Sequence, residues 1–147
     1  ANQIDDKFKN LKWITVRNPK NPDNEIKSIL KTIEILKQDK RKKMIISHYQ
    51  FFSIILEEDL NNPNRWYTHD NNSYPLKNNR YFRFYKKFFN NKVINNQIEV
   101  IYIMDDTVSG GLKISNFKEY LNDICFIDKN IIKNVLSSHT ITKCKIK

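Results

Sequence analysis

The sequence IEVIYIMDD, residues 98–106, is the clearest strand signal in the chain, because β-branched and aromatic side chains run up to two adjacent carboxylates. Such side chains favour extended backbone. The run from Met44 to Ile46, which Ser47 follows, is short and apolar throughout, as expected for a strand covered on both faces of a sheet. We therefore expect two buried strands, at residues 44–47 and 98–104.

Helical and extended patterns alternate around these two strands. Apolar side chains recur at helical spacing over residues 22–40, and Asn21 followed by Pro22 is a helix-start signal. A second long helix is expected over residues 76–94, with its aromatic side chains on one broad buried face. Shorter helical segments are expected at residues 51–56, 116–121 and 129–136, and strands at residues 13–16, 124–127 and 140–146, the last as an edge strand.

This order of elements predicts an α/β fold, a three-layer sandwich with a mainly parallel central sheet and a Rossmann-like order. At least three strands should be parallel, with residues 13–16, 44–47 and 98–104 as neighbours. The chain has two glycines, Gly110 and Gly111, so a glycine-rich phosphate loop is excluded and no nucleotide cofactor is expected. We expect residues 1–11 to be a leader or linker and residues 12–147 to be a single domain.

The 147 residues carry a formal net charge of +10, which is compatible with nucleic acid, anionic lipid or acidic glycans as partners. Lys outnumbers Arg 21 to 5, and an AT-rich coding sequence supplies Lys without any partner being involved. Cations concentrate at residues 40–43, where a helix should end, and at residues 80–87, where they border an aromatic helical stripe. Composition alone leaves the choice between a binding surface and a solvated one open.

The thiols and acidic side chains show no spacing that is diagnostic of a metal site. Cys125 and Cys144 are the two cysteines, 19 residues apart and outside any paired CxxC motif. Whether they form a disulfide stays open at this point. No apolar run approaches the roughly 20 residues that a membrane-spanning helix needs.

The segment NPNRWYTHD, residues 62–70, is the best candidate for ligand contact. Arg65, Trp66 and Tyr67 supply a planar cation and two stacking faces, which suit carbohydrate, phosphate or base recognition. The alternative is that Trp66 and Tyr67 anchor a long loop, with Arg65 paired to a structural carboxylate. We expect residues 57–75 to fold over the carboxyl edge of the sheet, with Trp66 at least partly buried and Arg65 in a shallow cleft.

Three titratable side chains are expected beside that cleft. His48 and Asp105 follow the strands at residues 44–47 and 98–104, and His69 lies in the loop that could fold toward them. Ligands of open α/β sheets bind at the carboxyl ends of the strands, and a His beside an acid can act as a general base. The alternative is a hydrogen-bonded structural His and acids that merely end a strand.

Three motifs together resemble a known family. They are SHYQF at residues 47–51, NPNRWY at residues 62–67 and an aromatic-basic stretch from Lys77 to Phe89. Their order resembles the soluble carboxyl-terminal portion of bacterial multi-pass membrane proteins in the dolichyl-phosphate-mannose mannosyltransferase-like group. The resemblance covers residues 44–104. It implies a chain taken from a larger protein, preceded by a transmembrane region and lying on the extracytoplasmic, periplasmic face of the membrane.

In that family the catalytic acid lies in a loop of the membrane region, so the resemblance implies an accessory domain without a complete active site. Its expected partner is a glycan or a lipid-linked sugar, contacted through Arg65, Trp66 and Tyr67. The competing hypothesis is a free-standing basic α/β domain. Such a domain would bind nucleic acid or act as a small hydrolase through His48, His69 and Asp105.

Overall fold

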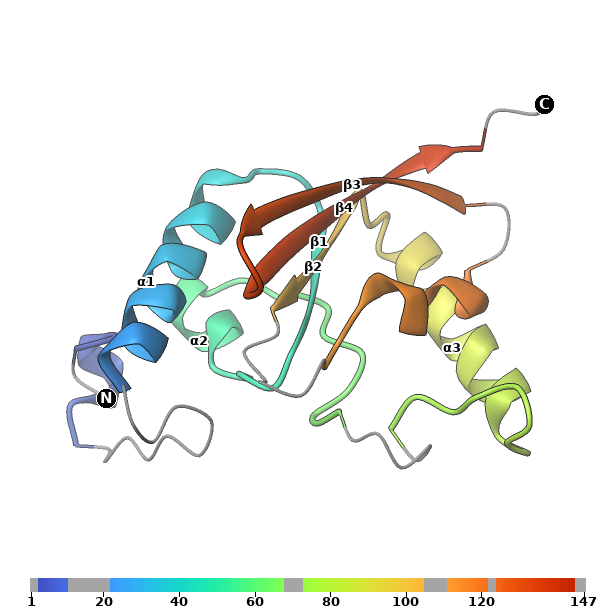
Figure 1. Cartoon of the computed structure of the whole chain (residues 1–147), viewed down its shortest axis with the longest axis horizontal. Helices are drawn as coiled ribbons and strands as arrows, with labels where there is room; N and C mark the ends of the chain where they lie inside the picture. Colours follow the sequence, from blue (N-terminus) through green and yellow to red (C-terminus); the bar gives the residue numbers. More distant parts are fainter. Residues whose placement is uncertain (1–2, 11–21, 68–72, 105–110, 122–123, 145–147) are drawn as a thin grey trace.

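The structure is a computed structural model that describes residues 3–10, 22–67, 73–104, 111–121 and 124–144. Three α-helices and four strands make up the described frame, together with three short 3-10 turns (Figure 1). The helices are α1 (Pro22–Gln38), α2 (Phe52–Leu56) and α3 (Phe82–Asn95), the strands are β1 (Lys43–Ser47), β2 (Val100–Met104), β3 (Ile124–Ile132) and β4 (Leu136–Lys143), and the 3-10 turns are η1 (Asp6–Phe8), η2 (Ile114–Asn116) and η3 (Lys118–Tyr120).

The four strands form one mixed sheet in the order β1-β2-β4-β3. β1 and β2 are parallel, with Lys43 opposite Val100 and Ser47 opposite Met104. β2 pairs with β4, and β4 with β3, in antiparallel fashion. The expected mainly parallel three-layer sandwich is therefore wrong: among the described strands, one pair is parallel. The expected strand at residues 13–16 lies outside the described residues.

The error arises at the carboxyl end of the chain. A second parallel neighbour for β2, beside β1, would need a crossover connection, usually a helix. The described elements between β2 and β3 are instead two 3-10 turns, and β3 and β4 form a hairpin whose second strand pairs with β2. The helical turns expected at residues 129–136 are instead strand and hairpin turn, with Asn134 in the left-handed region (φ 60°) and the Val135 amide donating to the Ile132 carbonyl at 2.9 Å. β4 is an interior strand of this sheet, so its expected place at the edge is also wrong.

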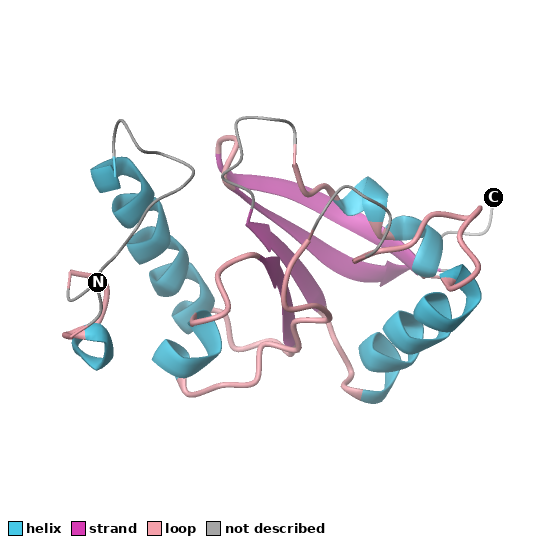
Figure 2. Cartoon of the chain, turned by 90° about the horizontal axis from the view of Figure 1, so that it is seen from below, coloured by secondary structure: helices cyan, strands magenta, loops and turns pink. Residues whose placement is uncertain are grey.

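The strands expected at residues 44–47 and 98–104 and the helix expected at residues 22–40 are confirmed as β1, β2 and α1. Every residue of β1 and β2 is buried, because side chains that alternate along these strands enter two different cores. The sheet lies between α1 and α3 in both views (Figures 1 and 2). On the α3 side the core holds Met44, Ile46, Ile101, Ile103, Phe89, Val93, Phe117 and Tyr120; on the α1 and α2 side it holds Ile45, Val100, Tyr102, Met104, Ile29, Leu36 and Phe52.

Two of the cations at residues 40–43, Arg41 and Lys43, form ion pairs within the fold. Arg41 binds Asp39 through Nε to Oδ1 at 3.0 Å and Nη2 to Oδ2 at 2.7 Å, and its Nη1 donates to Thr140 of β4 at 3.0 Å. The Tyr102 hydroxyl donates to Asp39 Oδ2 at 2.6 Å. Burial would raise the pKa of the Asp39 carboxyl, but the hydrogen bonds from Arg41 and Tyr102 outweigh burial and hold that pKa well below its ordinary value. Lys43 is buried and pairs with Glu58 at 2.6 Å.

Helix α3 differs from the expected helix with a single buried aromatic face. Phe89 and Val93 are buried, and Phe82 and Tyr85 pack against the same core. Tyr81, just before the helix, and Phe84 and Phe88 within it are exposed instead. The single broad buried face that periodicity suggested is therefore wrong, because the aromatic side chains divide between two sides of the helix. The described helices include none that is long and apolar enough to cross a bilayer.

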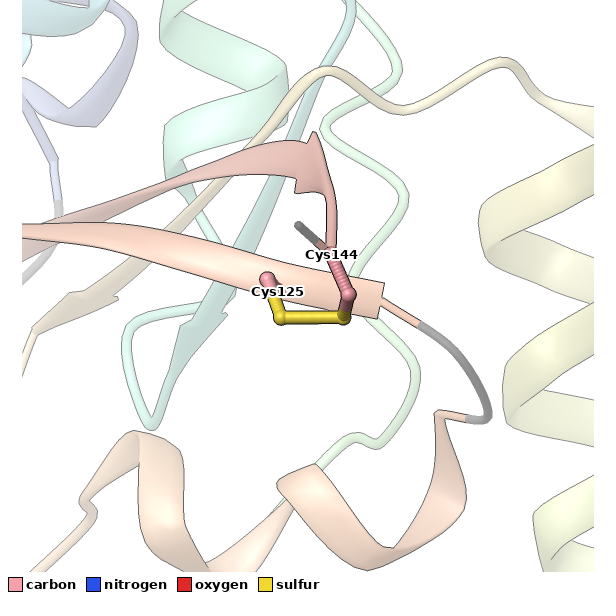
Figure 3. Close-up of a disulfide and its surroundings, with 2 residues drawn as sticks. All are labelled: Cys125 and Cys144. Carbon is pink, nitrogen blue, oxygen red and sulfur yellow. A yellow bond between two sulfur atoms is a disulfide. The ribbon is translucent and has the colours of Figure 1, made fainter. Parts of the chain in front are cut away.

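Cys125 and Cys144 form a disulfide that joins the beginning of β3 to the residue after β4 (Figure 3). Their Cα atoms lie 4.9 Å apart, because the antiparallel register sets Cys125 opposite Thr142, two residues before Cys144. The hairpin register thus decides the pairing that the sequence left open.

Candidate functional site

The loop that follows α2 runs beside β1 and is tied to its carboxyl end. The Ile45 amide donates to the Leu60 carbonyl at 2.9 Å, and Asn61 Nδ2 donates to the Lys43 carbonyl at 3.1 Å. At the end of β1, the Ser47 carbonyl accepts from Asn62 Nδ2 at 3.3 Å and from Gln50 Nε2 at 2.9 Å. The expectation that this loop returns to the carboxyl edge of the sheet is therefore confirmed for its described part.

Tyr67 is the anchor of this loop. Its side chain is 3% exposed, its ring lies among those of Tyr74 and Phe117, with centroids 6.4 and 6.0 Å away, and its hydroxyl donates to Asn62 Oδ1. Burial raises the pKa of this hydroxyl well above its ordinary value. His48, the first residue after β1, contacts the Tyr67 ring edge-on with a centroid distance of 5.7 Å. Predicted site residues from β1 and from the loop are thus brought together.

Arg65 and Trp66 lie on the outside of the same loop. With Asn64 and Ser73 they line an open depression of about 290 Å³. Trp66 is 68% exposed, so its expected partial burial is wrong: the loop places Tyr67 inside and the preceding side chain outside. Among the described residues Arg65 forms no ion pair with a carboxylate.

The wall of the depression is held in place by Asn64. Its Nδ2 donates to the Ser73 carbonyl at 2.5 Å, and its Oδ1 accepts from the Tyr85 hydroxyl of α3 at 2.8 Å. Gln50 Nε2 also donates to the Asn64 carbonyl at 3.3 Å. The backbone beside Arg65 and Trp66 is therefore connected to β1 and to α3, and these two side chains are presented on a fixed support.

Two of the predicted site residues, His69 and Asp105, lie outside the described residues. The expected cleft beside Asp105 lies outside the described residues in the same way. In the part of the chain that the structure describes, no group of three or more His, Cys, Asp or Glu side chains is arranged to hold a metal ion. The described part of the candidate site thus consists of Arg65 and Trp66 at the surface, with Tyr67 and His48 behind them.

A second polar cluster, which sequence reasoning missed, lies on the β3-β4 hairpin. His139 Nε2 is 2.8 Å from Ser137 Oγ, and His139 Nδ1 is 2.8 Å from Asp128 Oδ1. The imidazole is 5% exposed, and Lys118 Nζ lies 3.7 Å from Asp128 Oδ2. Ser137 and His139 are two residues apart and so share a face of the strand, which the sequence could have indicated. Asp128 joins them only because the hairpin register sets it opposite His139.

The hairpin residues have the same order of contacts as a catalytic triad, in which a base is hydrogen-bonded to a hydroxyl and is oriented by a carboxylate. Ser137 has the place of the hydroxyl, His139 that of the base and Asp128 that of the carboxylate. The arrangement at Arg65 and Trp66 is of a different kind, a surface for contact without a nucleophile.

Comparison with protein-family models, with curated proteins and with solved structures finds no match for this chain.

Proposed function

We propose that this chain is an accessory domain of a membrane glycosyltransferase-like protein and contacts a glycan or a lipid-linked sugar through Arg65 and Trp66. The observation that carries the proposal is the exposed indole of Trp66 beside an Arg65 guanidinium that pairs with no described carboxylate, both at an open depression. Aromatic faces pack against the apolar faces of sugars, and a guanidinium binds phosphate through two parallel hydrogen bonds. Together they fit a sugar that carries a phosphate.

The support behind these side chains favours binding. Ordering a loop costs conformational entropy, and a loop that is ordered before the ligand arrives avoids that cost on binding. Tyr67 and Asn64 supply this order through their contacts with Asn62, Tyr85 and Ser73. In this proposal Tyr67 and His48 position the loop, and Arg65 and Trp66 touch the ligand.

The proposed location is the extracytoplasmic face of a membrane. The resemblance described above implies this location, and the disulfide between Cys125 and Cys144 supports it. Disulfides form and persist in oxidising compartments and are rare in the reducing cytosol.

The test uses the fluorescence of Trp66 in a Trp13→Phe chain, where it is the remaining tryptophan. The probes are mannose, mannose 1-phosphate, inorganic phosphate and a short-chain polyprenyl-phosphate mannose. We expect a saturable change with the phosphate-linked sugars, weakened roughly tenfold or more by Arg65→Ala, which corresponds to about 1.4 kcal/mol. Lys129→Ala removes an exposed cation of β3 and serves as the control. The proposal fails if no probe gives a saturable change or if Arg65→Ala and Lys129→Ala bind alike.

A second candidate function is ester hydrolysis at Ser137, supported by its contact with His139 and that of His139 with Asp128. Ser137 Oγ would attack the carbonyl carbon while its proton passes to His139 Nε2. The C–O bond to the alcohol then breaks, the alcohol takes that proton, and an acyl group remains on Oγ. Water, deprotonated by the same nitrogen, attacks the acyl carbon and releases the acid and the serine. This set replaces His48, His69 and Asp105 as the hydrolase hypothesis.

Labelling with a fluorophosphonate probe and turnover of p-nitrophenyl acetate test this second candidate. Labelling and turnover above the buffer rate are expected in the parent chain and in Ser138→Ala, and both should be lost in Ser137→Ala. Equal labelling of parent and Ser137→Ala, or no labelling of either, would show that the cluster is structural only.

A further inference from the structure

Helix α3 carries a second apolar face that the fold leaves in water. Tyr81, Phe84 and Phe88 are 54%, 76% and 48% exposed, and their spacing of three and four residues sets them side by side on the helix. The adjoining side of the helix is already packed, with Phe89 and Val93 buried in the core and the Tyr85 ring 5.8 Å from that of Phe88. The exposed rings therefore do not result from a loosely docked helix, and they form an aromatic surface, which we call the α3 outer face.

Cations border the α3 outer face. Arg83 and Lys87 are exposed beside Phe84, and Arg80 lies over the Tyr81 ring at 4.6 Å. The helix sequence FRFYKKFFNNKVIN contains no acidic residue, although the chain as a whole has 16. The α3 outer face therefore combines apolar rings with positive charge that no acidic residue of the helix offsets, along a helix about 21 Å long, at 1.5 Å per residue.

We propose that the α3 outer face docks on the surface of an anionic lipid bilayer. Phe84 and Phe88 would enter the boundary between headgroups and acyl chains, Tyr81 would lie at headgroup depth, and Arg83 and Lys87 would pair with lipid phosphates. Cations would also attract a nucleic acid, but a duplex keeps its bases stacked inside and offers the exposed rings of Phe84 and Phe88 no apolar environment, whereas a bilayer does. Unpaired bases could stack on the rings, and single-stranded RNA is therefore included in the test. This inference goes beyond the proposed sugar contact, because it uses different residues and a different ligand.

Vesicle co-sedimentation tests this inference with vesicles of phosphatidylcholine alone and of phosphatidylcholine with phosphatidylglycerol. The parent chain should bind the anionic vesicles and should lose them as salt is raised. Phe84→Ser with Phe88→Ser should weaken that binding roughly tenfold or more, since each substitution removes a ring that the bilayer would bury. The matched control is Ile54→Ser with Ile127→Ser, two exposed apolar side chains of α2 and β3.

A second pair of variants tests the charge. Arg83→Glu with Lys87→Glu should reduce binding by at least roughly tenfold, whereas Lys129→Glu with Lys133→Glu, exposed cations of β3 and its turn, should reduce it far less. A further readout does not rely on weakening the binding. In a Phe84→Trp chain, with Trp13 and Trp66 replaced by Phe, the tryptophan fluorescence should shift to shorter wavelength on anionic vesicles.

Several results would overturn the inference. These are no binding of anionic vesicles by the parent chain, equal binding by the Phe variant and its Ile control, or no emission shift in Phe84→Trp. Binding of single-stranded RNA without vesicle binding would assign the face to nucleic acid. A dimer in sedimentation velocity that the Phe variant abolishes, without vesicle binding, would assign the face to a second copy. Since the vesicles contain no sugar and Arg65→Ala should still bind them, failure here is distinguishable from failure of the proposed function.

Discussion

Replacement of Tyr67 by Ala is expected to lower the free energy of unfolding by about 3 to 5 kcal/mol, the range for removing a large buried aromatic side chain. Tyr67 is buried among Tyr74, Phe117 and His48 and holds the loop through Asn62. Its loss creates a cavity in the core on the α3 side and releases the loop from it. Urea denaturation followed by far-UV circular dichroism measures the change.

Two further variants separate the contributions of the Tyr67 hydroxyl and of the Trp66 side chain to the free energy of unfolding. Tyr67→Phe keeps the ring and removes the hydroxyl, so it should cost about 1 kcal/mol, the usual net value of one hydrogen bond. Trp66→Ala removes the larger but exposed side chain and should change stability by less than about 0.5 kcal/mol. The assignment of Tyr67 as the anchor would be wrong if Trp66→Ala destabilised the domain as much as Tyr67→Ala.

Replacement of both Cys125 and Cys144 by Ser is expected to lower the free energy of unfolding by about 3 kcal/mol. In the chain-entropy account, the bond limits the unfolded chain, and a closed loop of this size gives that magnitude; the two cysteines are 19 residues apart. Dithiothreitol should lower the urea midpoint of the parent chain to that of the double variant and should leave the double variant unchanged. A parent midpoint that does not respond to reductant would show that the bond contributes nothing to stability.

The same pair of cysteines tests the proposed location. In cells that carry the natural protein, denaturation followed by thiol alkylation should label Cys125 and Cys144 only after reduction, because an oxidising compartment keeps them paired. Labelling without reduction would contradict the extracytoplasmic location and would leave the sugar contact at Arg65 and Trp66 to be judged by its own binding test.

Patterns within a few residues were enough to predict β1, β2 and α1. Alternation, apolar runs and helix-start signals are set by neighbours in the chain, so the apolar run at residues 44–47 and the Pro22 start signal predicted them without knowledge of their partners. Arg65 and Trp66 were also predicted as candidate ligand contacts from residue type, because a planar cation and an aromatic face suit sugar or phosphate recognition.

Local sequence patterns are therefore sufficient to predict the buried parallel pair and the long first helix, and composition excludes a glycine-rich phosphate loop. Tertiary packing is needed for the antiparallel direction of β3 and β4, the disulfide between Cys125 and Cys144, the contact of Asp128 with His139, and the burial of Tyr67 in place of Trp66. Each of these depends on which distant segment packs alongside. Strand direction and register follow from the pairing of whole segments, and a shift of one residue would turn every side chain of a strand to its other face.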